Sequence, residues 1–215
     1  MVQKRETKLN EIKKIITTSY ADVKNKNKFD SDLETQCLFG DKVSILKKEK
    51  HWSLCKLNDD GYIGWIRNSS LDDYFETDYL ISKIQSFAYT KPSYDAGVFF
   101  ELYLNSKIKV LEKLNNWVKI KLNKKKIAFV PIYHIRKQNS SHLNYIEIIQ
   151  MFENSPYLWG GKTVSGLDCS GLIQTSLQAS NLIVPRNAID QLNYRCDFLL
   201  DVETIEEECL IFWKG

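Results

Sequence analysis

Cys169 is the residue of this 215-residue chain best placed for nucleophilic chemistry. It lies in the run PYLWGGKTVSGLDCSG, residues 156–171, which holds four of the nine glycines in the chain. Apolar residues after Cys169 recur with helical spacing, so we expect the thiol at a helix N-terminus. The positive end of the helix dipole favours the thiolate there. A buried, inert thiol is the alternative that this spacing alone leaves open.

The same run supplies further candidate site residues. Tyr157 and Trp159 flank the glycines, and a tyrosine hydroxyl is a plausible donor to a substrate. Ser170 and Gly171 suit a first helical turn, because a serine hydroxyl bonds to backbone and a glycine permits close approach of another segment.

Composition restricts the class of protein. The chain is 43% hydrophobic and 27% charged, with a net charge of +3, so its charge gives no support to a nucleic-acid partner. The five cysteines form no CxxC pair, and we expect no metal, no cofactor and a reducing compartment. Residues 1–17 lack a continuous apolar core, with Ile12, Ile15 and Ile16 at helical spacing, and no run reaches transmembrane length. We therefore expect a cytoplasmic protein without membrane association, or one exported by a route that the sequence does not show.

The sequence before the Cys169 motif must form the elements that position it, and it begins with short runs of alternating polar and apolar residues that are typical of β-strands. Val43–Leu46, Trp52–Leu57 and Tyr62–Ile66 are separated by turn sequences, and Cys37 and Cys55 are expected in the strand core. A second copy follows. It matches 104–111 with 39–46, 116–120 with 51–55 and 127–131 with 62–66. Both units, at 18–75 and 80–138, resemble bacterial SH3-like domains.

Helical spacing replaces the alternation after Asn139. Leu143, Ile146, Ile149 and Phe152 predict a helix capped by Ser140 or Ser141 and ended before Pro156. A second helix should follow Cys169, with Ile173 and Leu177 on its apolar side, and Asn187 should cap a third. The final run, Cys209–Trp213, reads as a strand.

The motif around Cys169 resembles the NlpC/P60 family of papain-like cysteine peptidases. The resemblance rests on three features: PYLWGG, the step Asp168-Cys169-Ser170-Gly171, and Pro185-Arg186 with Gln191. It implies an α+β chain of two SH3-like β-barrels followed by part of a papain-like domain at 140–215. It also implies hydrolysis of the γ-D-glutamyl-diamino-acid bond of peptidoglycan-derived peptides.

Residue by residue, the resemblance makes Cys169 the nucleophile and places Tyr157 near the oxyanion. Asp168 and Ser170 match residues that hold the free amine of an N-terminal L-alanine. An SH3-like domain closes this pocket in the related subgroup, and Asp41 and Tyr74 are the candidates we name for that role.

Two features depart from the family pattern. Ala188 stands where the family often has a serine that contacts substrate. The family's base is a histidine that follows a run like LIFWKG, and this sequence ends at that run. His51, His134 and His142 lie elsewhere, and we expect them to be structural or exposed. A thiolate mechanism needs such a base.

Two hypotheses of different classes therefore stand. One is a cysteine peptidase of wall peptides, whose chain continues to a histidine. The other is a non-catalytic protein that binds the same peptides after losing the histidine. Apolar faces at Ile173 and Leu177 should be exposed unless another segment covers them.

Overall fold

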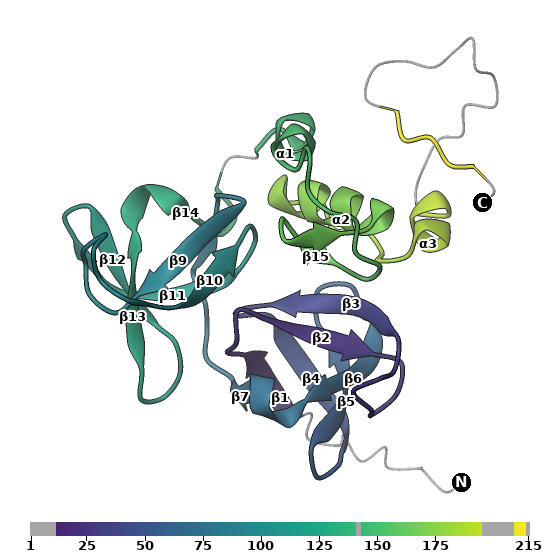
Figure 1. The fold of residues 1–215 in the computed structure, drawn as a ribbon, viewed down its shortest axis with the longest axis horizontal. Helices are drawn as coiled ribbons and strands as arrows, with labels where there is room; N and C mark the ends of the chain where they lie inside the picture. The colour runs from purple at the N-terminus through teal and green to yellow at the C-terminus, as the bar shows by residue number, and fades with distance from the viewer. Residues whose placement is uncertain (1–11, 141–142, 195–208, 214–215) are drawn as a thin grey trace, which may run out of the picture.

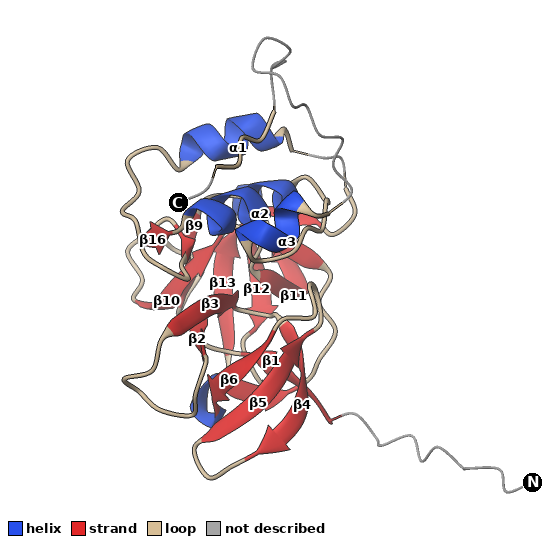
Figure 2. Cartoon of the chain, turned by 90° about the vertical axis from the view of Figure 1, so that its right-hand side faces the viewer, coloured by secondary structure: helices blue, strands red, loops and turns tan. Residues whose placement is uncertain are grey.

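The computed structural model describes residues 12–140, 143–194 and 209–213. Two antiparallel sheets curl into small barrels that lie beside each other, and a helical segment packs on top of both (Figures 1 and 2). The predicted class, α+β with two SH3-like β-barrels, is confirmed. No helix in the described part of the chain is long and apolar enough to span a bilayer.

The first sheet has the strand order β3-β2-β6-β5-β4-β1-β7. Its core contains alternate residues from these strands, among them Val23, Val43 and Ile66, together with Cys37 and Cys55 as predicted. The strands are β1 (Ile12–Ile16), β2 (Tyr20–Lys24), β3 (Leu33–Leu38), β4 (Lys42–Lys48), β5 (Trp52–Leu57), β6 (Ile63–Arg67) and β7 (Leu71–Asp73).

The second sheet repeats the first strand for strand, in the order β10-β9-β13-β12-β11-β8-β14. A one-residue bulge falls at matched places, between Ile45 and Lys47 in β4 and between Val110 and Glu112 in β11. The internal duplication therefore extends to the details of pairing. The strands are β8 (Tyr79–Ile81), β9 (Gln85–Tyr89), β10 (Val98–Tyr103), β11 (Lys107–Leu114), β12 (Trp117–Lys121), β13 (Ile127–Pro131) and β14 (Ile135–Lys137), with short 3-10 turns η1 (Asn68–Ser70) and η2 (Ile132–His134) at corresponding positions.

The pairing between neighbouring strands corrects one part of the sequence match between the two barrels. Trp52 pairs with Arg67 in the first barrel, and Trp117 pairs with Pro131 in the second. Ile127 therefore corresponds to Ile63, one residue later than the sequence match proposed. The error arises because the chain from Trp52 to Ile63 is one residue longer than the chain from Trp117 to Ile127.

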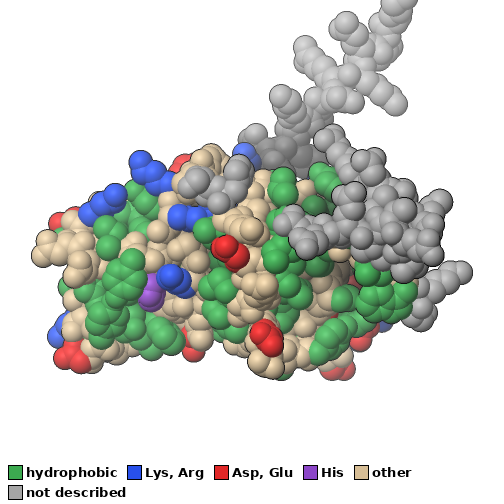
Figure 3. Space-filling model, turned by 90° about the horizontal axis from the view of Figure 1, so that it is seen from above, with side chains coloured by type: hydrophobic (Ala, Val, Ile, Leu, Met, Phe, Trp, Pro, Cys, Tyr) green, Lys and Arg blue, Asp and Glu red, His purple; other side chains and the backbone are tan. Residues whose placement is uncertain are grey.

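The helical segment contains α1 (Tyr145–Met151), β15 (Lys162–Thr163), β16 (Gly166–Leu167), α2 (Cys169–Ala179) and α3 (Ala188–Leu192). Ile148 and Phe152 of the first helical region pack with Leu167 and Ala179, and Leu104 of the second barrel joins this cluster. The cluster fixes α2 on the barrels. Viewed from the helical side, hydrophobic side chains also gather at the surface (Figure 3).

Four local features correct or refine the sequence reading. Residues 12–16, whose isoleucines were noted at helical spacing, form strand β1, which buries Ile15 and Ile16 at its end. The cap of α1 is Asn144, whose side chain accepts from the Ile146 N–H, rather than a serine. Asn187 occupies the N-cap position of α3 as expected, but its side chain makes no cap hydrogen bond and donates to Asp190 instead. Residues 209–213 form no strand within the described part of the chain, and Cys196 lies outside it.

Candidate active site

Cys169 is the first residue of α2, and Asp168 alone separates it from strand β16. Its side chain is solvent-exposed, so the alternative of a buried, inert thiol is wrong. Asp168 occupies the N-cap and accepts from the Gly171 N–H at 2.7 Å. The cap satisfies one of the free N–H groups of the first turn and fixes the direction in which the helix presents the thiol.

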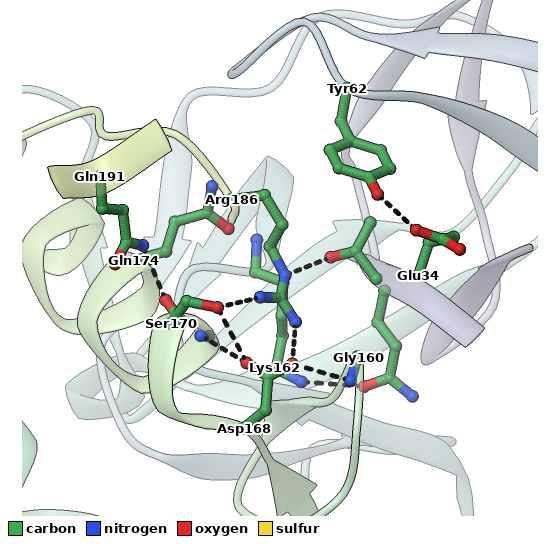
Figure 4. A network of polar contacts seen from close by, with 12 residues as sticks. Glu34, Tyr62, Gly160, Lys162, Asp168, Ser170, Gln174, Arg186 and Gln191 are labelled. Carbon is green, nitrogen blue, oxygen red and sulfur yellow. Dashed lines mark hydrogen bonds and ion pairs between the residues drawn. The ribbon is translucent and has the colours of Figure 1, made fainter. Parts of the chain in front are cut away.

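Asp168 lies at the centre of a buried polar network (Figure 4). Besides the cap, it accepts from the Gly160 N–H at 2.8 Å, the Ser170 hydroxyl at 3.3 Å and Arg186 Nη2 at 2.7 Å. Burial alone would raise the pKa of this carboxyl. The Arg186 guanidinium and the two backbone N–H groups outweigh burial and hold the pKa below its usual value.

Arg186 joins this network to the first barrel. The residue as a whole is 3% exposed. Nε donates to Thr35 Oγ1 in β3 at 2.7 Å, and Nη1 donates to Ser170 Oγ at 2.8 Å. Because Nη2 holds Asp168, one planar cation connects a barrel strand to both residues that flank Cys169. Sequence reasoning quoted Arg186 as part of a motif and gave it no role.

The glycines permit close approaches that a side chain would block. Gly160 has φ +76°, and a Cβ there would lie 2.7 Å from Leu33 Cγ in the first barrel. A Cβ on Gly171 would overlap the carbonyl oxygen of Gly161 and lie 2.9 Å from Asp168 Oδ1. The loop can therefore fold against both β3 and the start of α2 only because these positions are glycine.

Tyr157 precedes the glycine loop and forms a bridge to Leu167. Its side chain is 66% exposed. Local burial and the nearby Cys169 and Asp168 raise the pKa of its hydroxyl, so the group stays protonated near neutrality. Tyr157 is thus an exposed hydrogen-bond donor in the electrostatic environment of the thiol.

The first barrel adds a hydrogen-bonded pair of an acid and a tyrosine to this region (Figure 4). Tyr62, just before β6, donates its hydroxyl to Glu34 Oε2 in β3 at 2.7 Å. Burial and Glu34 raise the pKa of Tyr62 to about 12, although Arg186 and Asn187 act in the opposite direction. These influences place Tyr62 beside the residues that precede α3. Sequence analysis missed Glu34 and Tyr62, although Tyr62 lies in the DGYIGWI run that marked the SH3-like unit.

Asp41 and Tyr74, the named candidates for the pocket, make other contacts. Asp41 accepts from Lys107 of the second barrel at 2.8 Å and so links the two barrels. The Tyr74 ring lies under Lys42 Nζ, and burial and Glu76 raise the pKa of its hydroxyl to about 12. Their observed partners belong to the barrels and not to the Asp168 network.

Two histidines lie within the described residues. His51 is exposed in the turn before β5. His134 Nδ1 lies 2.8 Å from Ser86 Oγ in the second barrel, and burial lowers its pKa. Both match the expectation of structural or exposed histidines. His142 lies outside the described residues.

Around Ser170, Gln191 of α3 donates to the Ser170 and Pro185 carbonyl oxygens, each at 2.9 Å. Ala188, at the family's serine position, is exposed at the start of α3.

Ile173 and Leu177 are half-buried and line an apolar groove of about 500 Å³ with Leu210. The expected apolar face of α2 is therefore present and partly covered.

Two SH3-like barrels thus support a short helical segment that presents an exposed thiol at a helix N-terminus. Residues 154–215 match the family described as NlpC/P60, and residues 25–71 match the bacterial dipeptidyl-peptidase Sh3 domain. The resemblance is confirmed: the chain carries an NlpC/P60 segment behind SH3-like barrels.

Two curated relatives are named gamma-D-glutamyl-L-lysine dipeptidyl-peptidase. The protein from Bacillus subtilis (strain 168) is 26% identical over 175 residues, covering 75% of this chain and 58% of the relative. The protein from Bacillus cereus (strain ATCC 10987) is 27% identical over 207 residues, covering 84% and 60%. This chain thus spans less than two thirds of the length of either relative.

Solved structures show the same fold. An NlpC/P60 family protein from Bacillus cereus has a TM-score of 0.76 at 20% identity, covering 90% of this chain and 80% of that protein. An NlpC/P60 endopeptidase from Photobacterium damselae subsp. piscicida has a TM-score of 0.65 at 18% identity, covering 89% and 48%. At these identities the likeness concerns the fold alone.

Proposed function

We propose that this protein is a cysteine peptidase that cleaves the γ-D-glutamyl-diamino-acid bond of peptidoglycan-derived peptides. One observation carries the proposal: an exposed thiol at the N-terminus of α2, with both neighbouring residues held by a single buried arginine. The two named dipeptidyl-peptidases support the choice of substrate class.

In the proposed reaction, the Cys169 sulfur attacks the γ-carbonyl carbon of D-glutamate. A thioester forms as the amide C–N bond breaks, and the proton from the thiol goes to the departing amine of the diamino acid. Water then hydrolyses the thioester and restores the thiol. The N-terminus of α2 favours negative charge on sulfur, and the exposed Tyr157 hydroxyl would donate to the developing oxyanion.

The free amine of the substrate requires a carboxylate with an unused oxygen. A carboxylate accepts about four hydrogen bonds, and Asp168 already accepts from Gly160, Gly171, Ser170 and Arg186. Tyr62 uses Oε2 of Glu34 and leaves Oε1 for another donor. We therefore assign the charge opposite the substrate amine to Glu34, with Asp168 and Ser170 shaping the pocket behind it.

This assignment gives the first barrel a role in specificity. Glu34 and Tyr62 come from β3 and the β5–β6 loop, whereas Cys169 comes from α2. A carboxylate fixed by the barrel would select peptides whose amino end is free, and cleavage would then release a dipeptide from that end.

Hydrolysis of L-Ala-γ-D-Glu-diaminopimelate tests the proposal. The assay compares the 215-residue chain, the longest product of its reading frame, and a Cys169→Ala variant of that product, with Cys55→Ala as a buried-thiol control. We expect release of the Ala-Glu dipeptide by the longest product and none by Cys169→Ala. Full activity of Cys169→Ala would refute the assignment of the nucleophile.

The alternative is a non-catalytic protein that binds the same peptides. It would be favoured if the longest product bound the tripeptide, lost that binding on Glu34→Gln and cleaved nothing. Among the described histidines, His134 contacts Ser86 and His51 is exposed in the first barrel, and neither is hydrogen-bonded within the Asp168 network, so the longest product of the reading frame is the decisive sample.

A further inference from the structure

The duplicated barrels differ at one surface in a way that indicates a ligand. Each barrel has an eight-residue loop, 25–32 or 90–97, whose ends are closed by one backbone hydrogen bond. Asn25 N donates to Asp32 O in the first barrel, and Thr90 N donates to Gly97 O in the second. Residues in these loops can therefore be compared one to one.

In the first barrel, the loop places Phe29 against Trp52 at the start of β5, with ring centroids 5.6 Å apart. Arg67, the strand partner of Trp52, lies over Phe29 with its guanidinium carbon 4.4 Å from the ring centroid. The aromatic surface of this barrel is thus occupied by a cation from its own chain.

In the second barrel, the loop places Tyr94 against Trp117, with ring centroids 4.9 Å apart. The strand partner of Trp117 is Pro131, so the second barrel has no guanidinium at the position that Arg67 occupies in the first barrel. Lys24 of the first barrel is also replaced, by Tyr89, as their equivalent pairing with β6 and β13 shows. Two positions that hold cations in the first barrel therefore hold a proline and a tyrosine in the second.

These replacements leave an aromatic cluster of Tyr89, Tyr94 and Trp117, in which Tyr94 is exposed, Tyr89 is half-buried and Trp117 is buried. Tyr89 packs edge-on against both other rings, at 6.1 Å and 5.2 Å. Tyr94 is 59% exposed, and its neighbour Asp95 carries a negative charge, whereas Lys91 stands three residues before Tyr94 in the same loop. Among the described residues, no lysine or arginine lies over these three rings.

We propose that this surface of the second barrel binds a peptide through a cationic side chain, which stacks on Tyr94 as Arg67 stacks on Phe29. Charge complementarity selects the occupant: the electron-rich ring faces and Asp95 favour a guanidinium or an ammonium. The loop lies at the opposite end of the β9–β10 hairpin from Tyr103, which contacts Ser165 of the loop before β16. The interaction is therefore separate from the candidate active site and independent of its activity.

The test uses acetyl-Gly-Arg-Gly-amide as the probe and acetyl-Gly-Gln-Gly-amide as its neutral match. Binding is followed by NMR shifts of the Trp117 indole N–H in the 215-residue chain. We expect saturable shifts with the arginine peptide and none with the glutamine peptide. Tyr94→Ala should weaken affinity about two- to five-fold, the range for exposed cation–π contacts, whereas Phe29→Ala should leave it unchanged.

A second variant tests the comparison between the barrels. Pro131→Arg restores the first barrel's arrangement, so its own guanidinium should occupy Tyr94 and abolish the shifts. Equal shifts with both peptides, no shifts with either, or undiminished binding by Pro131→Arg would overturn the proposal. Shifts with chitotriose instead of the arginine peptide would also overturn it, and would indicate a glycan surface.

Discussion

Arg186 Nη2 donates to Asp168 Oδ2 at 2.7 Å, and the two side chains are 2% and 9% exposed. This ion pair stabilises the start of α2, because Asp168 also caps that helix. It depends on the first barrel as well, because Thr35 accepts from the same guanidinium. The geometry around Cys169 is thus coupled to packing between the barrel and the helix.

Removing the guanidinium with Arg186→Met leaves the Asp168 carboxylate buried without its counter-ion. We expect the free energy of unfolding to fall by about 3–5 kcal/mol, the usual cost of breaking a buried pair. Urea denaturation at pH 7 measures the change. Lys48→Met, at the exposed end of β4, is the control and should have little effect.

The same pair predicts a pH dependence. The folded pKa of Asp168 is lowered, so its contribution is present above the unfolded value near 4 and is lost as pH falls through the folded value. The stability difference between wild type and Arg186→Met should therefore shrink under acid. A difference that stays constant down to pH 2 would contradict the role of this carboxylate.

Gly160→Ala and Gly171→Ala test the loop packing. At Gly160, which has a left-handed φ of +76°, the new Cβ would clash with Leu33. At Gly171 the new Cβ would clash with the backbone carbonyl of Gly161 in the glycine loop. The left-handed conformation alone costs about 1–2 kcal/mol, and the clash adds to it. We expect a lower thermal midpoint for both variants. Gly97→Ala, whose nearest neighbour would be 3.9 Å away, should keep the midpoint of wild type.

Lys107 lies between Asp41 and Asp59 of the opposite barrel, and these carboxylates raise its pKa despite its burial. Lys107→Met leaves two carboxylates close together without their shared cation. We predict a loss of about 3–5 kcal/mol in the free energy of unfolding. Lys124→Met removes an exposed partner of Asp73 and should not change the denaturation midpoint measurably.

Glu34→Gln and Tyr62→Phe test the amine pocket within the proposed function. Both should raise KM for a tripeptide with a free amino end by about ten-fold or more, since a charged hydrogen bond contributes about 1.5–3 kcal/mol. Neither should change cleavage of the N-acetylated tripeptide, which lacks the charge. An equal loss for both substrates would indicate a structural role instead.

Much of this architecture could be predicted from sequence. Short alternating runs separated by turn residues identified the barrels, and the Trp52 and Trp117 landmarks identified their duplication. The apolar residues after Cys169 identified α2, because its residues repeat with helical spacing. Local sequence carries this information directly.

Other features depend on contacts between distant residues. Strand β1 was missed because its two buried residues, Ile15 and Ile16, are adjacent, so IKKII lacks the alternation that identifies the other strands. Glu34 and Tyr62 were missed because they are 28 residues apart and meet only through barrel closure. Arg186 is 151 residues from Thr35, and no spacing rule connects them.

Acid-quenched mass spectrometry most directly tests the claim that Cys169 is the nucleophile. The longest product of the reading frame is mixed with L-Ala-γ-D-Glu-diaminopimelate, quenched within milliseconds to seconds, and digested for peptide mapping. The account predicts an Ala-γ-Glu thioester on the peptide that contains Cys169, and its absence in Cys169→Ala. An adduct on another residue, or dipeptide release that persists in Cys169→Ala, would contradict it.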